Sequence, residues 1–162
     1  MDDRRNSGKD IQGLLVHPGE IVVVQHASVL VTVVSFGVCV CMWDKKTHIG
    51  GISHFVKPRI TDPVGATAVF GNVAVQTLVR TMCKYGIKES LEAQIFGGAT
   101  CTAGDTRGAL NAEIARAVLI KRGVPIASDD TGGNKGRKLL FDTQSGHVAV
   151  LKVHSLRQED WS

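Results

Sequence analysis

The part of this chain that most constrains its fold is residues 29–58, which read VLVTVVSFGVCVCMWDKKTHIGGISHFVKP. The first half is a dense run of β-branched and other apolar residues, and the second half is a shorter apolar run that reaches His54. Short apolar runs bounded by turn signals are typical of buried strands, and the polar segment between them predicts a turn. We therefore expect a buried hairpin that carries Cys39, Cys41 and then an imidazole.

The rest of the chain alternates between strand and helix patterns. Apolar residues at helical spacing predict two helices. The first ends at Gly86 and has the apolar stripe Val75, Leu78, Val79 and Met82. The second begins near Ala109, ends at Gly123 and has the stripe Leu110, Ile114, Ala117 and Val118. Strands are predicted at residues 20–25, 28–34, 38–43, 49–56, 91–96, 124–127, 139–142 and 147–153.

This order of elements predicts an α/β (α+β) sandwich, with a mixed β-sheet and two main helices. A chain of 162 residues is long enough for one domain with a real core. We expect a flexible N-terminal segment at residues 1–12, a single domain at 13–156 and a polar tail at 157–162.

Composition narrows the classes of function. The N-terminus, MDDRRNSGKD, lacks the apolar segment of a signal peptide, and no apolar run is long enough to span a membrane. We therefore expect a cytoplasmic protein without membrane insertion. The net charge of +4 permits an acidic partner, but the basic residues are spread along the chain, so nucleic-acid binding has only the charge in its favour. The cysteines and histidines lack metal-ligand spacing, and we expect neither a metal nor a cofactor.

Cys39, Cys41 and His54 are the first candidates for chemistry. A cysteine attacks as a thiolate, and a neighbouring histidine can take its proton and return it to a leaving amine. Such a pair suits amide cleavage, deamidation or acyl transfer. The alternative is structural, because free cysteines in apolar strands are commonly small core residues.

A second candidate is the glycine-rich loop TGGNKGR at residues 131–137. It does not fit the phosphate-loop pattern, and it precedes a predicted strand where that motif requires a helix. We expect a close-packed turn or the wall of a cleft.

Several segments, taken in chain order, resemble one family. They are VCVCMWD at 38–44, GGISH at 50–54 with Pro58 after it, AQIFGGA at 93–99, GALN at 108–111 and DTGGNKGR at 130–137. Together they resemble the chemoreceptor glutamine deamidases of bacterial chemotaxis, CheD, over roughly residues 16–153. No single motif is decisive, but the ordered set is specific.

The resemblance implies an α/β sandwich with a Cys–His–Thr constellation. The thiolate would attack the carboxamide of a receptor glutamine, ammonia would leave, and water would hydrolyse the thioester to give glutamate. The implied partners are the cytoplasmic helices of methyl-accepting chemoreceptors and a CheC-type phosphatase of the response regulator.

This sequence departs from the family pattern at the nucleophile. A gap-free comparison anchored at Asp44 and at the GG..H segment puts the family histidine on His54 and the family cysteine on Gly37. The family threonine falls on Val31, with Thr32 one place away. Because side chains alternate along a strand, a one-residue slip would turn Thr32 to the opposite face.

Two interpretations follow. In the first, which we favour, the nucleophile has been lost and the protein is a CheD-like pseudoenzyme that binds receptor or phosphatase. In the second, Cys39 replaces it, with His54 as general base and acid and Thr32 as a weak orienter. Cys39 would lie about 7 Å along the strand from the family position, whereas proton transfer requires about 3 Å. Only a shift of the strand would then make the protein a glutamine deamidase.

Overall fold

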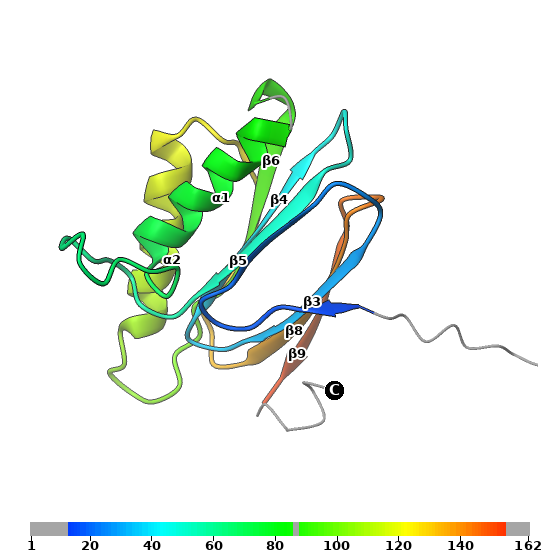
Figure 1. Cartoon of the computed structure of the whole chain (residues 1–162). Helices are drawn as coiled ribbons and strands as arrows, with labels where there is room; N and C mark the ends of the chain where they lie inside the picture. The colour runs from blue at the N-terminus through cyan, green and yellow to red at the C-terminus, as the bar shows by residue number, and fades with distance from the viewer. Residues whose placement is uncertain (1–12, 86–87, 155–162) are drawn as a thin grey trace, which may run out of the picture.

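The structure, a computed structural model, describes residues 13–85 and 88–154. Two helices, α1 (Gly71–Tyr85) and α2 (Arg107–Lys121), cover one face of a five-stranded sheet, and a four-stranded sheet covers its other face (Figure 1). This arrangement confirms the predicted α/β (α+β) sandwich. The strands, however, divide over two stacked sheets instead of forming one.

Each sheet combines antiparallel and parallel pairs. The five-stranded sheet has the order β2-β5-β4-β6-β7, with only β6 and β7 parallel. The four-stranded sheet has the order β1-β3-β8-β9, with only β1 and β3 parallel. The strands are β1 (Leu14–Leu15), β2 (Ile21–Val24), β3 (Val29–Val34), β4 (Val38–Asp44), β5 (Gly50–Phe55), β6 (Leu91–Gly97), β7 (Ile126–Thr131), β8 (Gly136–Asp142) and β9 (Val148–Val153); a short 3₁₀ turn, η1 (Lys88–Ser90), precedes β6.

The predicted hairpin of β4 and β5 lies at the centre of the molecule. Val38, Val40 and Met42 of β4 belong to the core between the five-stranded sheet and the helices. Cys39 and Cys41 alternate with them and belong to the core between the two sheets. A strand buried on both faces needs apolar residues at every position, which explains the continuous apolar run in the sequence.

The predicted stripe of α1 is confirmed, because Val75, Leu78, Val79 and Met82 are all buried. The predicted stripe of α2 is partly wrong. Ile114 and Val118 are buried, but Leu110 is 46% exposed and Ala117 is exposed as well. The buried face of α2 instead carries small and polar residues where the helix approaches the sheet closely: Gly108, Asn111, Ala112 and Ala115.

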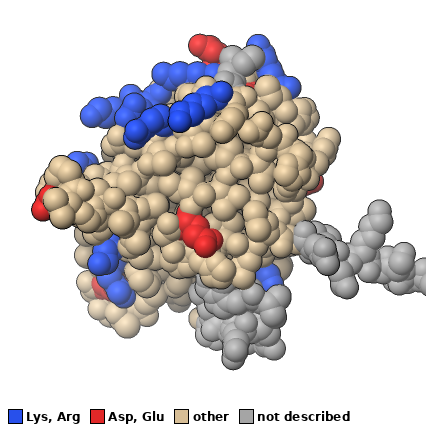
Figure 2. Space-filling model, in the orientation of Figure 1, with Lys and Arg blue, Asp and Glu red and all other residues tan. Residues whose placement is uncertain are grey.

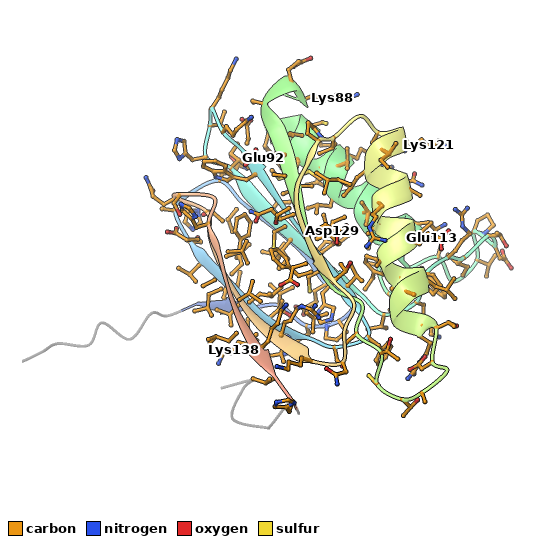
Figure 3. All side chains as sticks on the ribbon, turned by 180° about the vertical axis from the view of Figure 1, so that it is seen from behind. Lys88, Glu92, Glu113, Lys121, Asp129 and Lys138 are labelled. Carbon is orange, nitrogen blue, oxygen red and sulfur yellow. The ribbon has the colours of Figure 1, made fainter. Side chains whose placement is uncertain are left out.

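The strand boundaries near the glycine-rich loop also differ from the prediction. β7 continues to Thr131, because Asp129, Asp130 and Thr131 pair with the end of β6, and β8 already begins at Gly136. An ion pair between Arg116 of α2 and Asp129 (Nε–Oδ2, 2.6 Å) ties this edge to the helix, and Figure 3 shows Asp129 on the strand beside α2. The predicted flexible segment 1–12, the helix end at Gly86 and the tail 157–162 lie outside the described residues.

Positive charge gathers at one end of the molecule (Figure 2). This end carries the β4–β5 turn, η1 and the C-terminal ends of both helices, and Figure 3 labels Lys88 and Lys121 there. Cations near helix C-termini interact favourably with the helix dipoles. The exposed cations on these elements are Lys45, Lys46, Arg80, Lys84, Lys88, Lys121 and Arg122.

No helix within residues 13–85 and 88–154 is long and apolar enough to cross a membrane.

Candidate functional site

The candidate residues meet at the end of the molecule opposite the basic end. Here β4 and α2 begin and β5 and β6 end, and the bend at residues 35–37 carries the chain from the four-stranded sheet to the five-stranded sheet. Thr32 comes from β3 of one sheet, and His54 comes from β5 of the other. Gly37 lies in the bend that joins them.

Thr32 points into the space between the sheets, as Leu30 and Val34 on either side of it do. Its Oγ1 lies 3.0 Å from His54 Nδ1 and donates a hydrogen bond to the carbonyl oxygen of Val16 at 2.6 Å. The expectation that a one-residue slip turns Thr32 away from the site is therefore wrong.

These two contacts define the tautomer of His54. The Val16 carbonyl oxygen can only accept, so Thr32 spends its single hydroxyl proton on that contact. Toward His54, Thr32 Oγ1 must then act as the acceptor, and Nδ1 must carry the ring proton. Nε2 is left unprotonated, which is the state that a general base requires.

Gly37 lies on the Nε2 side of this ring. A Cβ built on Gly37 would be 3.3 Å from His54 Nε2 and 2.8 Å from the carbonyl oxygen of Phe55. A side chain at position 37 would therefore begin beside the unprotonated nitrogen. Glycine leaves that nitrogen without a nucleophile.

Cys39 is closer to His54 than the spacing along β4 suggested. The two residues are direct cross-strand partners, and partners of this kind have Cβ atoms about 4.5–5.5 Å apart. Burial is the larger obstacle to chemistry, because Cys39 has no exposed surface. Burial, with a smaller contribution from Cys41, raises the pKa of the Cys39 thiol well above its ordinary value, although the nearby Thr32 side chain opposes this shift.

The surroundings of His54 lower its pKa. Only 2% of its surface is exposed, and burial lowers its pKa to about 4. The exposed residues His17 and Glu20 lie nearby, where His17 lowers and Glu20 raises the pKa of His54. Their segment is fixed to β5 by hydrogen bonds from Gly19 N to His54 O and from His54 N to Glu20 O. The imidazole is thus neutral at physiological pH.

The depressed pKa of His54 predicts that acid destabilises the fold. Between the unfolded value near 6.5 and the folded value of about 4, the unfolded chain binds the extra proton, so stability is complete above pH 6.5 and falls as the pH drops. The loss should approach about 3 kcal/mol at pH 4. Urea unfolding at several pH values measures it, and His54→Gln should remove most of this pH dependence. An unchanged slope in that variant would contradict the assignment to His54.

Two segments hold the backbone around Gly37 in place. Gly98 N donates to Gly37 O at 2.7 Å, and Ala99 N donates to Ser35 O at 3.0 Å. On the other side, the buried Asn111 of α2 donates from Nδ2 to the carbonyl oxygens of Phe36 (3.0 Å) and Val56 (3.1 Å). These glycines and Asn111 belong to motifs found in the sequence, but the sequence indicated no role for Asn111.

The loop from Gly132 to Lys135 packs against the same backbone. Gly132 N donates to Gly97 O, and Thr100 N donates to Gly133 O. The buried Arg137 donates to the carbonyl oxygens of Gly132 and Lys135. These contacts agree with the predicted close-packed turn. Across the described residues there is no group of three or more His, Cys, Asp or Glu side chains that could hold a metal ion.

Comparison with known proteins identifies the family to which this chain is similar. The family model described as CheD chemotactic sensory transduction matches residues 57–152. A probable chemoreceptor glutamine deamidase CheD from Sulfurimonas denitrificans is 31% identical over 85% of this chain and 92% of its own length. A second such protein, CheD 1 of Anaeromyxobacter dehalogenans, is 36% identical over 85% and 83% of the two chains.

The chain belongs to the CheD family. The family prediction from sequence is therefore confirmed. The match to the family model begins at Lys57, so the stretch with Thr32, Gly37 and His54 precedes it. In this CheD protein the site has a neutral imidazole in contact with Thr32 and no side chain at position 37.

Proposed function

We propose that this CheD protein acts on glutamine side chains of chemoreceptor cytoplasmic helices, at the site formed by Thr32, His54 and Gly37. The names of its relatives state that class of target for them. The observation that carries the proposal is the hydrogen bond between Thr32 and His54, with Nε2 turned toward position 37. Action on receptor helices of this kind would require a cytoplasmic location.

Deamidation through Cys39 remains the first candidate for the outcome of binding. It would require β4 to move so that a glutamine can reach a thiol that has no exposed surface. The raised pKa of Cys39 adds a second cost, because little thiolate forms at neutral pH.

Recognition without hydrolysis is the second candidate, and the burial of Cys39 favours it. His54 and Thr32 keep their hydrogen bond in the absence of a thiol at position 37. In this role the protein occupies receptor glutamines, and a CheC-type phosphatase is a further partner for the same surface.

The deciding experiment combines binding with mass spectrometry on a purified chemoreceptor cytoplasmic fragment. We expect wild type to bind the fragment without converting glutamine to glutamate, and His54→Ala to bind about tenfold more weakly through loss of a buried hydrogen-bond partner. Conversion by wild type that disappears in both Cys39→Ala and His54→Ala would instead establish deamidation through Cys39. Absence of binding by wild type would contradict the receptor as target.

A further inference from the structure

The glycine-rich loop after β7 borders a polar cavity that the proposed function does not use. The cavity has a volume of about 300 Å³ and is lined by the end of β7, residues 132–135 of the loop, Arg137 of β8 and Lys152 of β9. We propose that this cavity binds a phosphate group, either as free phosphate or as the phosphate monoester of a small molecule. The proposal stands independently of the receptor as target, because none of the cavity residues belongs to the candidate functional site.

The side chains that line the cavity carry an excess of positive charge. Lys135, Arg137 and Lys152 are cationic, and only Asp130 is anionic. Asp130 Oδ1 pairs with Arg137 Nη2 at 3.2 Å and with Lys152 Nζ at 3.0 Å. One carboxylate cannot balance three cations, so two positive charges remain in excess. A phosphate monoester carries close to two negative charges at neutral pH and therefore matches this excess.

Arg137 provides a buried donor that lacks a partner. Only 3% of its side chain is exposed. Nη1 donates to the carbonyl oxygen of Lys135 and Nη2 to that of Gly132, but Nε has no hydrogen-bond partner among the described residues. A buried donor without a partner is costly, and more so on a charged group. Because Arg137 lines the cavity, a phosphate oxygen bound there can accept the missing hydrogen bond, in the kind of pairing that arginine forms best.

The backbone of the loop adds further donors. Gly132 and Gly133 have positive φ values of 89° and 69°, and a Cβ on either would meet no atom within 4 Å. The N–H groups of Gly133, Asn134 and Lys135 make no hydrogen bond within the part of the chain that the structure describes. Successive N–H groups in turns of this kind form concavities that bind anions. Strand β8 follows the loop where a nucleotide-binding phosphate loop has a helix, so the side chains supply most of the charge.

Amide spectra of the ¹⁵N-labelled full chain test the proposal. We expect titration with inorganic phosphate, at an ionic strength held constant with sodium chloride, to shift the resonances of Gly133, Asn134 and Lys135 and to saturate at millimolar concentration. Acetate, which carries a single charge, should bind at least about tenfold more weakly. Glycerol 3-phosphate distinguishes the two sources. Saturation with it as well shows that the cavity accepts a phosphorylated molecule, whereas saturation with inorganic phosphate alone identifies free phosphate as the ligand.

Charge variants separate binding in the cavity from a general effect of phosphate on the protein. Lys135→Gln should weaken phosphate binding at least about tenfold, through loss of a charged donor. Asp130→Asn should strengthen it about threefold, because the competing carboxylate is removed. Lys138→Gln is the matched control. Lys138, labelled in Figure 3, follows Arg137 in β8, so its side chain lies on the opposite face of the strand, and the variant should keep the affinity of wild type.

Three results would overturn the proposal. The first is the absence of a saturable shift in wild type, and the second is equal weakening by Lys135→Gln and Lys138→Gln. The third is equal affinity for acetate and phosphate, which would contradict the assignment of a phosphate group. The test leaves Arg137 unchanged, because this side chain holds the loop through the carbonyl oxygens of Gly132 and Lys135 and its loss would disrupt the cavity itself.

Discussion

Gly37→Cys is expected to give this protein glutamine deamidase activity at least about 100-fold above that of Gly37→Ala. The new thiol would begin beside His54 Nε2, the unprotonated nitrogen that Thr32 fixes in place. His54 can take the thiol proton and return it to the departing ammonia. Mass spectrometry of a receptor fragment measures this gain in activity as the conversion of glutamine to glutamate.

Two control variants separate the chemical effect of the thiol from the steric effect of any side chain at position 37. Any Cβ at position 37 lies 2.8 Å from the carbonyl oxygen of Phe55, so the backbone must shift slightly. Gly37→Ala needs the same shift but adds no nucleophile, and Gly37→Cys combined with His54→Ala keeps the thiol but lacks its base. A folded Gly37→Cys protein that binds receptor and converts no glutamine would refute position 37 as the place of the nucleophile.

Gly108→Ala should destabilise the fold by at least about 3 kcal/mol, the largest stability change we expect from a single methyl group. In an unobstructed helix the same change would stabilise by about 1 kcal/mol, because alanine is the better helix former. Here a Cβ on Gly108 would overlap the carbonyl oxygens of Gly98 and Ala99. The 97–100 segment would be pushed away from Gly37, which it holds by hydrogen bonds.

Urea unfolding of Gly108→Ala and a matched variant, Gly104→Ala, measures this effect. A Cβ added at Gly104 would meet no atom within 4 Å, and the residue has a φ of 80°, so its variant should lose only about 1 kcal/mol through backbone strain. Gly108→Ala should also weaken receptor binding, since the displaced segment supports the site. Equal stability of the two variants would show that α2 can move away from the 97–100 segment without cost.

Much of the fold follows from patterns within single segments. The continuous apolar run of β4 predicts a strand buried on both faces, and the stripe of α1 predicts the helix that covers one of them. The stripe of α2 misleads, because close approach to the sheet selects Gly108 and Ala112 in place of large residues. The division into two sheets depends on pairing between distant strands such as β3 and β8, which no local pattern records.

The candidate site, too, could be predicted from the sequence only in part. His54 and Thr32 could be selected from the sequence, but not their contact, because they come from different sheets and the bend at residues 35–37 adjusts their register. The burial of Cys39 follows from the apolar run of β4, but the second sheet that covers it could not be predicted from that run. Nothing in the sequence indicates that Asn111 donates hydrogen bonds to two backbone carbonyl oxygens.

The backbone hydrogen bonds around Gly37 have a genetic consequence. Gly98, Ala99 and Asn111 hold this bend through main-chain carbonyl groups, and none of these contacts uses a side chain at position 37. Apart from the slight backbone shift that a Cβ at position 37 requires, these hydrogen bonds can hold the bend with or without a thiol there. Glycine and cysteine codons such as GGU and UGU differ by a single base. If Gly37→Cys gains activity as expected, one point mutation separates the silent and hydrolytic forms of this site.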